Sequence, residues 1–196
     1  MRLGVLVSGR GSNLEAVLRA DFAVAIVISN RAGARALEVA TGHGVQVRVL
    51  RRADFADAGA RDASIGEALT QAHVDLALLA GYDQLLRPPY FAAFGGRTIN
   101  IHPSLLPAHG GAGMTGAAVH RSVLDSGDLA SGVTIHEVTP DLDGGPILAQ
   151  ARVSVLPGDD AEILAARVLH EEHRLLVSTL EDLAAGCARR RVKAGA

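Results

Sequence analysis

The sequence predicts an α/β fold: a doubly wound, mostly parallel sheet with helices on both faces. Hydrophobic residues make up 48% of the 196-residue chain, aromatic residues only 3%, and tryptophan is absent, so the core must consist mainly of Val, Leu, Ile and Ala. That composition suits helices packed on a parallel sheet. Short apolar segments also alternate with segments of helical periodicity, as in consecutive βαβ units, and a glycine-rich turn follows the first of them. Ligands of such sheets bind beyond the carboxyl ends of the strands.

Each predicted element follows from the local pattern of apolar and turn-forming residues. In the first half, buried strands are expected at residues 3–7, 23–29, 46–50, 74–79 and 98–101. In the second half, the pattern predicts a helix at 115–124, strands at 133–138 and 147–155, and a turn at 141–146 between those strands. Asp159 or Asp160 is expected to cap a final helix that ends near residue 185, before Gly186.

The composition also excludes several classes of function. A net charge of −2 gives no broad basic surface for a nucleic acid, and we interpret the basic residues 189–193 as a solvated terminus. The single cysteine, Cys187, excludes an internal disulfide and fits a reducing compartment. No apolar run approaches the ~18 residues that span a bilayer, and the first strand begins too early for a signal peptide. We therefore expect a cytoplasmic protein with no nucleic-acid or membrane partner.

The turn after the first strand, residues 8–14, has the composition of a phosphate-binding loop. Glycines allow a tight turn, and the amides at the following helix N-terminus favour an anion. The expected contacts are Gly11, Ser12 and Asn13. Leu14 replaces the third glycine of a dinucleotide fingerprint, and Asn30 ends the second strand where an acidic residue would bind ribose, so a mononucleotide is favoured over NAD. The alternative is that Ser12 or Asn13 simply caps the helix.

A second group of polar residues ends the fifth predicted strand. Asn100 and His102 are two residues apart, so their side chains point to the same side of the sheet. Asp143 lies in a Gly-Gly-Pro turn that can return a carboxylate to this edge, where it would stabilise a protonated His102 for acid catalysis or for an oxyanion that Asn100 also binds. Thr134 and His136 on the preceding strand are candidate supporting residues. The alternatives are that His102 is an ordinary core histidine, that Asn100 has only a structural role and that Asp143 only helps to form the turn.

Four sequence motifs resemble those of a known family. SGRGSNLEA at 8–16, NIHPSLLP at 100–107, GVTIHEV at 132–138 and DLDGGPI at 141–147 look like the phosphoribosylglycinamide formyltransferases, in the same order and spacing. The likeness covers nearly the whole chain. It implies a Rossmann-like formyltransferase domain over residues 1–196, with a nucleotide-phosphate-binding half at 1–100 and a folate-binding and catalytic half at 101–196.

The resemblance implies an activity and a set of roles. The activity is transfer of the formyl group of 10-formyltetrahydrofolate, a co-substrate, to the amine of 5'-phosphoribosylglycinamide in de novo purine biosynthesis, by a monomer or homodimer. The catalytic set would be Asn100, His102 and Asp143. The nucleotide would be bound by Gly11, Ser12 and Asn13, and its ribose by Glu172. The folate would contact Asp83, Gln84, Leu85, Leu86, Asn100, Thr139, Pro140, Asp141, Leu142 and Asp143.

The sequence departs from the family pattern in three places. Asp83 and Gln84 replace a Met-Arg pair, which removes one positive side chain near the folate tail. Arg61 is the candidate, within residues 55–69, for the basic residue that binds the folate glutamate. Residues 109–114 form a longer loop where Tyr-Pro-Gly is usual.

Several alternatives to this activity stay open. The same motifs occur in methionyl-tRNA formyltransferases and formyltetrahydrofolate hydrolases, although the glycine loop and the short length favour the glycinamide enzymes. A module that binds a nucleotide without chemistry is the non-enzyme alternative. The expected reaction is direct attack of the amine on the formyl carbon, and Cys187 is too near the end of the last helix to be an attractive nucleophile. A metal is not expected, because no Cys or His pair stands at a ligand spacing with a third partner.

Overall fold

The computed structural model describes the backbone of residues 1–194 and the side chains of residues 1–186. Cys187 and the basic residues 189–193 therefore lie outside the residues whose side chains are described. The strands are β1 (Leu3–Val7), β2 (Val24–Ser29), β3 (Gln46–Val49), β4 (Leu76–Leu79), β5 (Arg97–His102), β6 (Ala130–Glu137) and β7 (Ile147–Ser154). The helices are α1 (Ser12–Arg19), α2 (Arg35–Gly42), η1 (Arg52–Asp54), α3 (Ala58–Gln71), α4 (Pro88–Ala93), α5 (Ala117–Ser126) and α6 (Ala161–Ala194).

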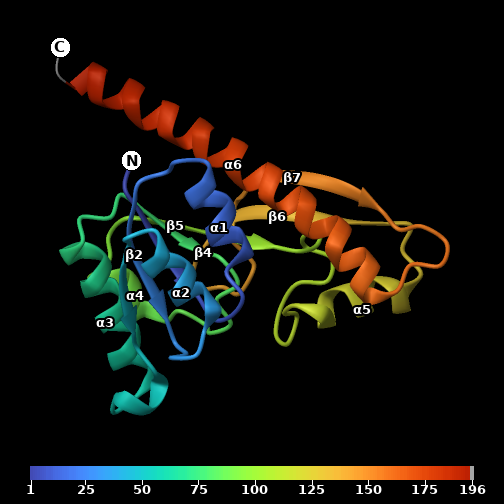
Figure 1. Ribbon diagram of the computed structural model, residues 1–196, viewed down its shortest axis with the longest axis horizontal. Coiled ribbons are helices and arrows are strands. Elements are labelled where there is room, and N and C mark those ends of the chain that lie inside the picture. Colours follow the sequence, from blue (N-terminus) through green and yellow to red (C-terminus); the bar gives the residue numbers. More distant parts are fainter. Residues whose placement is uncertain (195–196) are drawn as a thin grey trace.

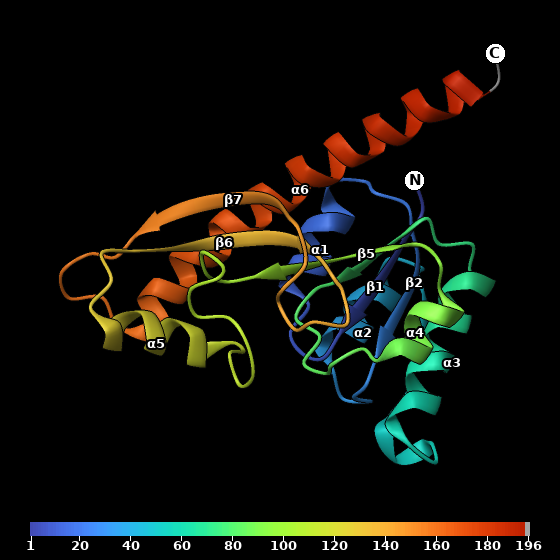
Figure 2. The ribbon, with the colours of Figure 1, turned by 180° about the vertical axis from the view of Figure 1, so that it is seen from behind.

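All seven strands belong to one sheet in the order β3-β2-β1-β4-β5-β6-β7 (Figure 1). Strands β1 to β5 pair in parallel, whereas β5–β6 and β6–β7 pair antiparallel. Strands β6 and β7 extend beyond the parallel part and, with α5 and the start of α6, form the end of the molecule away from α3 and α4 (Figures 1 and 2). The predicted doubly wound, mostly parallel fold is confirmed.

Two apolar cores cover the two faces of this sheet. In β1, Leu3, Val5 and Val7 pack in the core that includes α1, α2 and α6, while Leu6 packs in the core of α3 and α4. This alternation is the two-residue period of a strand buried on both faces. Gly4 allows close packing here, because a Cβ at this position would lie 2.3 Å from Leu69 Cδ2 of α3 and that side chain would have to move.

The predicted segments differ from the observed ones in two informative places. Strand β3 was expected to be buried but is exposed along its length, because it is the edge strand and pairs only with β2. Helix α6 does not stop before Gly186 but continues to Ala194, since a glycine inside a helix costs only about 1 kcal/mol and does not force an end. Asp160 caps α6 as predicted: its Oδ1 accepts hydrogen bonds from Glu162 N at 2.9 Å and Ile163 N at 2.8 Å.

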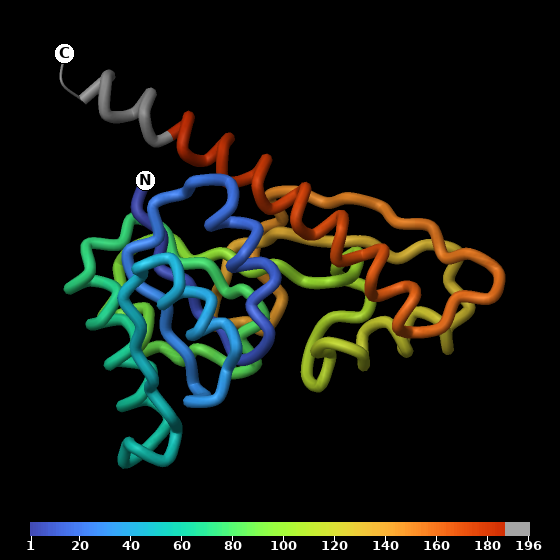
Figure 3. Tube along the Cα trace, viewed as in Figure 1, coloured from blue at the N-terminus to red at the C-terminus, as the bar shows by residue number. Residues whose placement is uncertain are grey.

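Helix α6 connects regions that are far apart in the sheet. It packs on α1 and α5 and on strands β6 and β7, and it runs diagonally from the β6–β7 end toward the N-terminal half (Figures 1 and 3). Leu164, Val168 and Leu176 anchor it in the core. Within the described part of the chain, none of the helices combines the length and apolar character needed to cross a membrane.

Candidate active site

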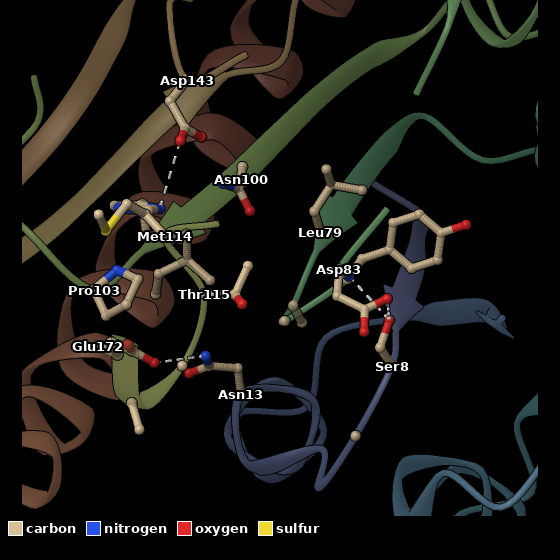
Figure 4. Close-up of a pocket in the computed structure, with 18 of the residues that line it drawn as sticks. Ser8, Asn13, Leu79, Asp83, Asn100, Pro103, Met114, Thr115, Asp143 and Glu172 are labelled. Carbon is tan, nitrogen blue, oxygen red and sulfur yellow. Dashed lines mark hydrogen bonds and ion pairs between the residues drawn. The ribbon is translucent and has the colours of Figure 1, made fainter. Parts of the chain in front are cut away.

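A cleft of about 1200 Å³ opens beyond the carboxyl ends of β1, β4 and β5, where ligands of such sheets bind. Its lining includes 8–13, 79–86, 100–103, 111, 113–117, 138–139 and 141–143, together with residues of α6. Ser8 and Asp83 lie on one side of the cleft, Asn100 and Asp143 on the opposite side, and Asn13 and Glu172 lie between the two helices that they belong to (Figure 4). The sequence-predicted site residues therefore converge on this one space, apart from Thr134, which lies beneath it, Pro140 and the candidate Arg61.

The conformation of the predicted phosphate-binding loop, residues 8–14, depends on Gly11. Its φ of 83° lies in the left-handed region, and a Cβ there would lie 2.7 Å from Ala36 Cβ and 2.8 Å from Ala36 Cα. Gly11 is itself the N-cap of α1, and no side chain of the described residues accepts a hydrogen bond at this cap. The alternative that Ser12 or Asn13 caps the helix is therefore wrong. The amides of the first turn remain available to an anion in the cleft.

Asn13 and Glu172 form a buried pair across the helices α1 and α6. Asn13 Nδ2 donates to Glu172 Oε2 at 2.7 Å, and the two residues are only 8% exposed. Burial raises the pKa of Glu172, and the hydrogen bond from Asn13 only partly opposes this effect. Asn13 Oδ1 is buried without a partner among the described residues, which leaves an acceptor for a ligand hydroxyl or amine. Two residues that were predicted to bind the nucleotide are thus in direct contact.

Asn100, His102 and Asp143 also come together, with His136 among them. His102 Nδ1 lies 4.0 Å from Asp143 Oδ2, and His136 Nε2 lies 3.6 Å from Asp143 Oδ1. The antiparallel register sets Asn100 directly opposite His136, and Asn100 Nδ2 donates to His136 Nε2 at 3.1 Å. Asp143 has a φ of 53°, a left-handed conformation that aspartate tolerates better than most residues. We name Asn100, His102, His136 and Asp143 the histidine wall of the cleft.

The two histidines of this wall have different hydrogen-bond partners. His136 Nδ1 donates to Glu137 O at 2.9 Å, so Nε2 is free to accept from Asn100, and burial lowers the pKa of His136. His102 Nε2 donates to His109 O at 2.9 Å, which leaves Nδ1 facing Asp143. His136 is therefore held as the neutral ring, whereas His102 presents the nitrogen that can exchange a proton with the cleft.

Thr134 lies beneath this wall and supports it indirectly. It is fully buried, and its Oγ1 donates to Ser104 O at 2.7 Å. Thr134 Oγ1 also accepts a hydrogen bond from Leu106 N at 3.0 Å. Gln150 Nε2 donates to it at 2.8 Å. Thr134 thus fixes the course of the segment that leaves His102.

The opposite side of the cleft carries a hydrogen-bonded cluster of which only Asp83 was among the predicted site residues, as a folate contact. Ser8 Oγ donates to Asn30 Oδ1 at 2.7 Å, and Asn30 Nδ2 donates to Asp83 Oδ1 at 2.8 Å. Ser8 Oγ also lies 2.9 Å from Asp83 Oδ1, so its single hydroxyl proton is shared between these two acceptors, and Asp83 is paired with Arg31. Burial raises the pKa of Asp83, but the hydrogen bonds from Asn30, Ser8 and Gln84 and the charge of Arg31 together lower it. We name Ser8, Asn30 and Asp83 the N-terminal wall.

His120 is a further cleft residue that the sequence reasoning missed. It is 5% exposed, it lines the cleft from α5, and its Nδ1 has no hydrogen-bond partner among the described residues. Burial and the nearby His102 lower its pKa. Helical position alone could not single it out from the other histidines, because the orientation of α5 depends on tertiary packing.

Arg61 does not have the position expected of a folate-tail residue. Its side chain is 1% exposed and its Nε and Nη2 donate to Asp62 Oδ1 at 2.9 and 2.6 Å. Its Nη1 donates to Gln84 Oε1 at 3.2 Å, and Arg61 is not among the described residues that line the cleft. Asp62 Oδ2 in turn accepts from Arg87 N at 3.0 Å. Arg61 and Asp62 therefore support the 83–87 segment from behind.

The remaining predicted folate residues form two loops at the mouth of the cleft. Leu85 is 44% exposed and Leu142 is 50% exposed, and both line the cleft. Thr139, Asp141 and Leu142 line it too, whereas Pro140 is not among its described lining residues. No cluster of three or more metal-ligating side chains occurs among the described residues.

The sheet order, the cleft and the sequence motifs agree with one protein family. A family model described as Formyl transferase matches residues 1–180, and the chain belongs to that family. It is 37% identical to the phosphoribosylglycinamide formyltransferase of Escherichia coli (strain K12), over 89% of this chain and 83% of that protein. The resemblance inferred from the motifs is thereby confirmed.

Solved structures and longer relatives agree with this assignment. The structure of glycinamide ribonucleotide transformylase 1 from Symbiobacterium toebii matches with a TM-score of 0.89 and 43% identity, over 95% of this chain and 88% of that one. The trifunctional purine biosynthetic protein adenosine-3 of Drosophila pseudoobscura pseudoobscura is 39% identical over 96% of this chain. The chain spans only 14% of that relative's length.

Proposed function

We propose that this protein transfers the formyl group of 10-formyltetrahydrofolate to the amine of 5'-phosphoribosylglycinamide, a step of de novo purine biosynthesis. The observation that carries the proposal is that one cleft holds both a helix N-terminus suited to a phosphate and the histidine wall. The names of relatives that this chain matches over most of their length support the same reaction.

The nucleotide is assigned to the end of the cleft formed by α1 and α6. The phosphate would accept hydrogen bonds from the amides of Gly11, Ser12 and Asn13 at the positive end of α1. Glu172 lies beside this helix and offers carboxylate oxygens to the ribose hydroxyls. This placement directs the glycinamide amine away from α1, toward the middle of the cleft.

The folate is assigned to the mouth between the 83–86 and 139–143 segments. The exposed Leu85 and Leu142 suit the flat faces of its ring systems, and the backbone of these segments offers donors and acceptors for the polar ring edge. The residues present thus fit a folate. Its bound form supplies the formyl carbon and the nitrogen that leaves.

The histidine wall performs the proton and charge chemistry of the transfer. As the amine nitrogen bonds to the formyl carbon, the formyl oxygen gains negative charge, and Asn100 keeps a second amide N–H for it. A proton on His102 Nδ1 stabilises the same charge. Asp143, 4.0 Å from that nitrogen, stabilises this proton and passes the amine proton through water to the departing nitrogen as its bond to carbon breaks.

A formyltetrahydrofolate hydrolase is the alternative with the same histidine wall. It would use water in place of the amine and would not need the phosphate end of the cleft. The test is to measure 10-formyltetrahydrofolate consumption with and without 5'-phosphoribosylglycinamide. Consumption that requires the nucleotide is expected; equal consumption without it would establish the hydrolase, and nucleotide binding without any turnover would establish a sensor module.

We propose that the protein is cytoplasmic and acts on its small-molecule substrates as a monomer or homodimer. The net charge of −2 gives no broad basic surface for a nucleic-acid partner. We also propose the division of labour between residues 1–100, which bind the nucleotide phosphate, and 101–196, which carry most of the folate and catalytic contacts.

A further inference from the structure

The segment from His109 to Gly111 contacts two members of the histidine wall, His102 and Asp143. His109 O accepts from His102 Nε2 at 2.9 Å, and Gly111 N donates to Asp143 Oδ2 at 2.8 Å. His102 and Asp143 do not hydrogen-bond to each other, because His102 Nδ1 and Asp143 Oδ2 are 4.0 Å apart. Their separation is therefore set by this short piece of backbone.

The segment is itself fixed by the side chain of His109. Nδ1 of this ring lies 2.8 Å from Ser122 Oγ of α5, and Nε2 lies 2.7 Å from Asp128 Oδ2 just after α5. The side chain is only 13% exposed, and the hydrogen bond from His109 lowers the pKa of Asp128. These contacts hold the backbone of His109 at a φ of 55°, a conformation that residues other than glycine rarely adopt.

The position of the His109 carbonyl has a chemical consequence for His102. A carbonyl oxygen only accepts hydrogen bonds, so Nε2 of a neutral His102 must carry the proton and Nδ1 must be the basic nitrogen. Nδ1 is the atom that faces Asp143 and the cleft. If the carbonyl moved away, the ring could also take the other tautomer, in which Nδ1 cannot accept a proton.

Ser122, His109 and Asp128 have the composition of a nucleophilic triad, but their position favours another role. Ser122 is not among the described residues that line the cleft, so its hydroxyl does not meet a substrate there. The contacts of the His109 ring instead lead through its own backbone to His102. We propose that His109, locked by Asp128 and Ser122, is a positioning residue that fixes the tautomer of His102 and its separation from Asp143.

The inference rests on the proposed formyl transfer. Its test uses three variants of the full chain, Asp128→Ala, Asp128→Asn and Ser122→Ala. Asp128→Ala removes the acceptor of His109 Nε2, whereas the amide oxygen of Asp128→Asn replaces it. Asp125→Ala, which removes an exposed carboxylate from the last turn of α5 outside these hydrogen bonds, is the matched control.

We expect Asp128→Ala to lower kcat on the order of tenfold with both KM values within about twofold, because a small misplacement of reacting groups slows the chemical step more than binding. Ser122→Ala should have a smaller effect of the same kind. Asp128→Asn should restore most of the rate, and Asp125→Ala should match the parent.

A nitrogen-15 NMR measurement of the His102 ring tests the tautomer without any substrate, with His102→Gln to assign the signal. The neutral ring of the parent should show the Nε2–H form, and the neutral ring of Asp128→Ala should show a mixture of both forms. An unchanged tautomer in a folded Asp128→Ala, or an Asp128→Asn as slow as Asp128→Ala, would overturn the inference. Failure of the parent to transfer a formyl group would instead overturn the proposed function, and the NMR result would still decide the role of His109.

Discussion

The N-terminal wall and the histidine wall face each other across one cleft, yet they are built differently (Figure 4). Ser8, Asn30 and Asp83 are joined by hydrogen bonds of 2.7 to 2.9 Å. In the histidine wall, Asp143 lies 4.0 Å from His102 and 3.6 Å from His136. One wall therefore satisfies its polar groups internally, whereas the other leaves donor and acceptor capacity for reactants.

The difference has its origin in the sheet. The N-terminal wall lies at the ends of β2, β1 and β4, which are neighbours in the parallel part, so its members are fixed by backbone pairing. Asp143 instead lies in the turn between two antiparallel strands and reaches the site through a loop. A rigid wall suits binding, and incompletely paired groups that tighten around a substrate suit catalysis.

The largest effect is expected from changes in the histidine wall. His102→Ala and Asp143→Ala should each lower kcat on the order of 100-fold or more, because the charge that they stabilise develops mainly in the transition state. The double variant should lose much less than the product of the two single losses, since the pair acts as a unit. Steady-state kinetics with both substrates measures this, and multiplicative losses would show that the two residues serve separate steps.

Gly11→Ala should have the next largest effect, on nucleotide binding. The new Cβ would lie 2.7 Å from Ala36 Cβ at a φ of 83°, so α1 or α2 must shift and the phosphate amides move with it. We expect the KM for the nucleotide to rise about tenfold, with a smaller change in the KM for folate. Gly33→Ala is the control, because a Cβ there meets nothing within 4 Å in the described part of the chain. An unchanged KM in a folded Gly11→Ala would show that this loop is only a turn.

Asp83→Ala should affect stability more than kcat. It leaves Asn30 Nδ2 without its acceptor, whereas Ser8 Oγ keeps Asn30 Oδ1 as an acceptor, and the loss should cost about 1–3 kcal/mol in the free energy of unfolding. The pKa of Asp83 is lowered in the folded state, so its contribution is present above the usual carboxyl pKa of 3.8 and is lost as the pH falls through the lower folded value. Urea unfolding at neutral and acidic pH should therefore show a difference from the parent that shrinks with acid. A kcat loss as large as that of Asp143→Ala would contradict the contrast between the walls.

Glu172→Gln should give the smallest change in stability and the opposite pH dependence. Burial raises the pKa of Glu172, so the folded state holds its proton more tightly and the ionised side chain destabilises the fold as the pH rises through the raised value. The neutral variant should raise the Tm by about 2–4 °C near pH 8, and this gain should vanish below the usual carboxyl pKa of 4.5. The KM for the nucleotide should rise as well. A constant gain at all pH values would mean that packing, and not charge, is responsible.

Local pattern and strand parity predicted a large part of this molecule. The period of two set Asn100 and His102 on one side of β5, and the Gly-Gly-Pro turn marked Asp143. The N-terminal wall was out of reach, because pairing Ser8 with Asn30 and Asp83 requires the strand order, which apolar patterns do not encode. The burial of Arg61 and the anchoring of His109 on α5 likewise depend on packing between elements distant in sequence.

Helix α6 also limits how the cleft can open. At 34 residues it is about 51 Å long. Its first turns line the cleft beside α5, and Glu172 further along ties it to Asn13 of α1. A hinge motion that swung the β6–β7 end away from the parallel strands would have to bend this rod or break the buried Asn13–Glu172 bond. We therefore expect substrate entry and product release to depend on the loops at the mouth of the cleft rather than on lobe closure.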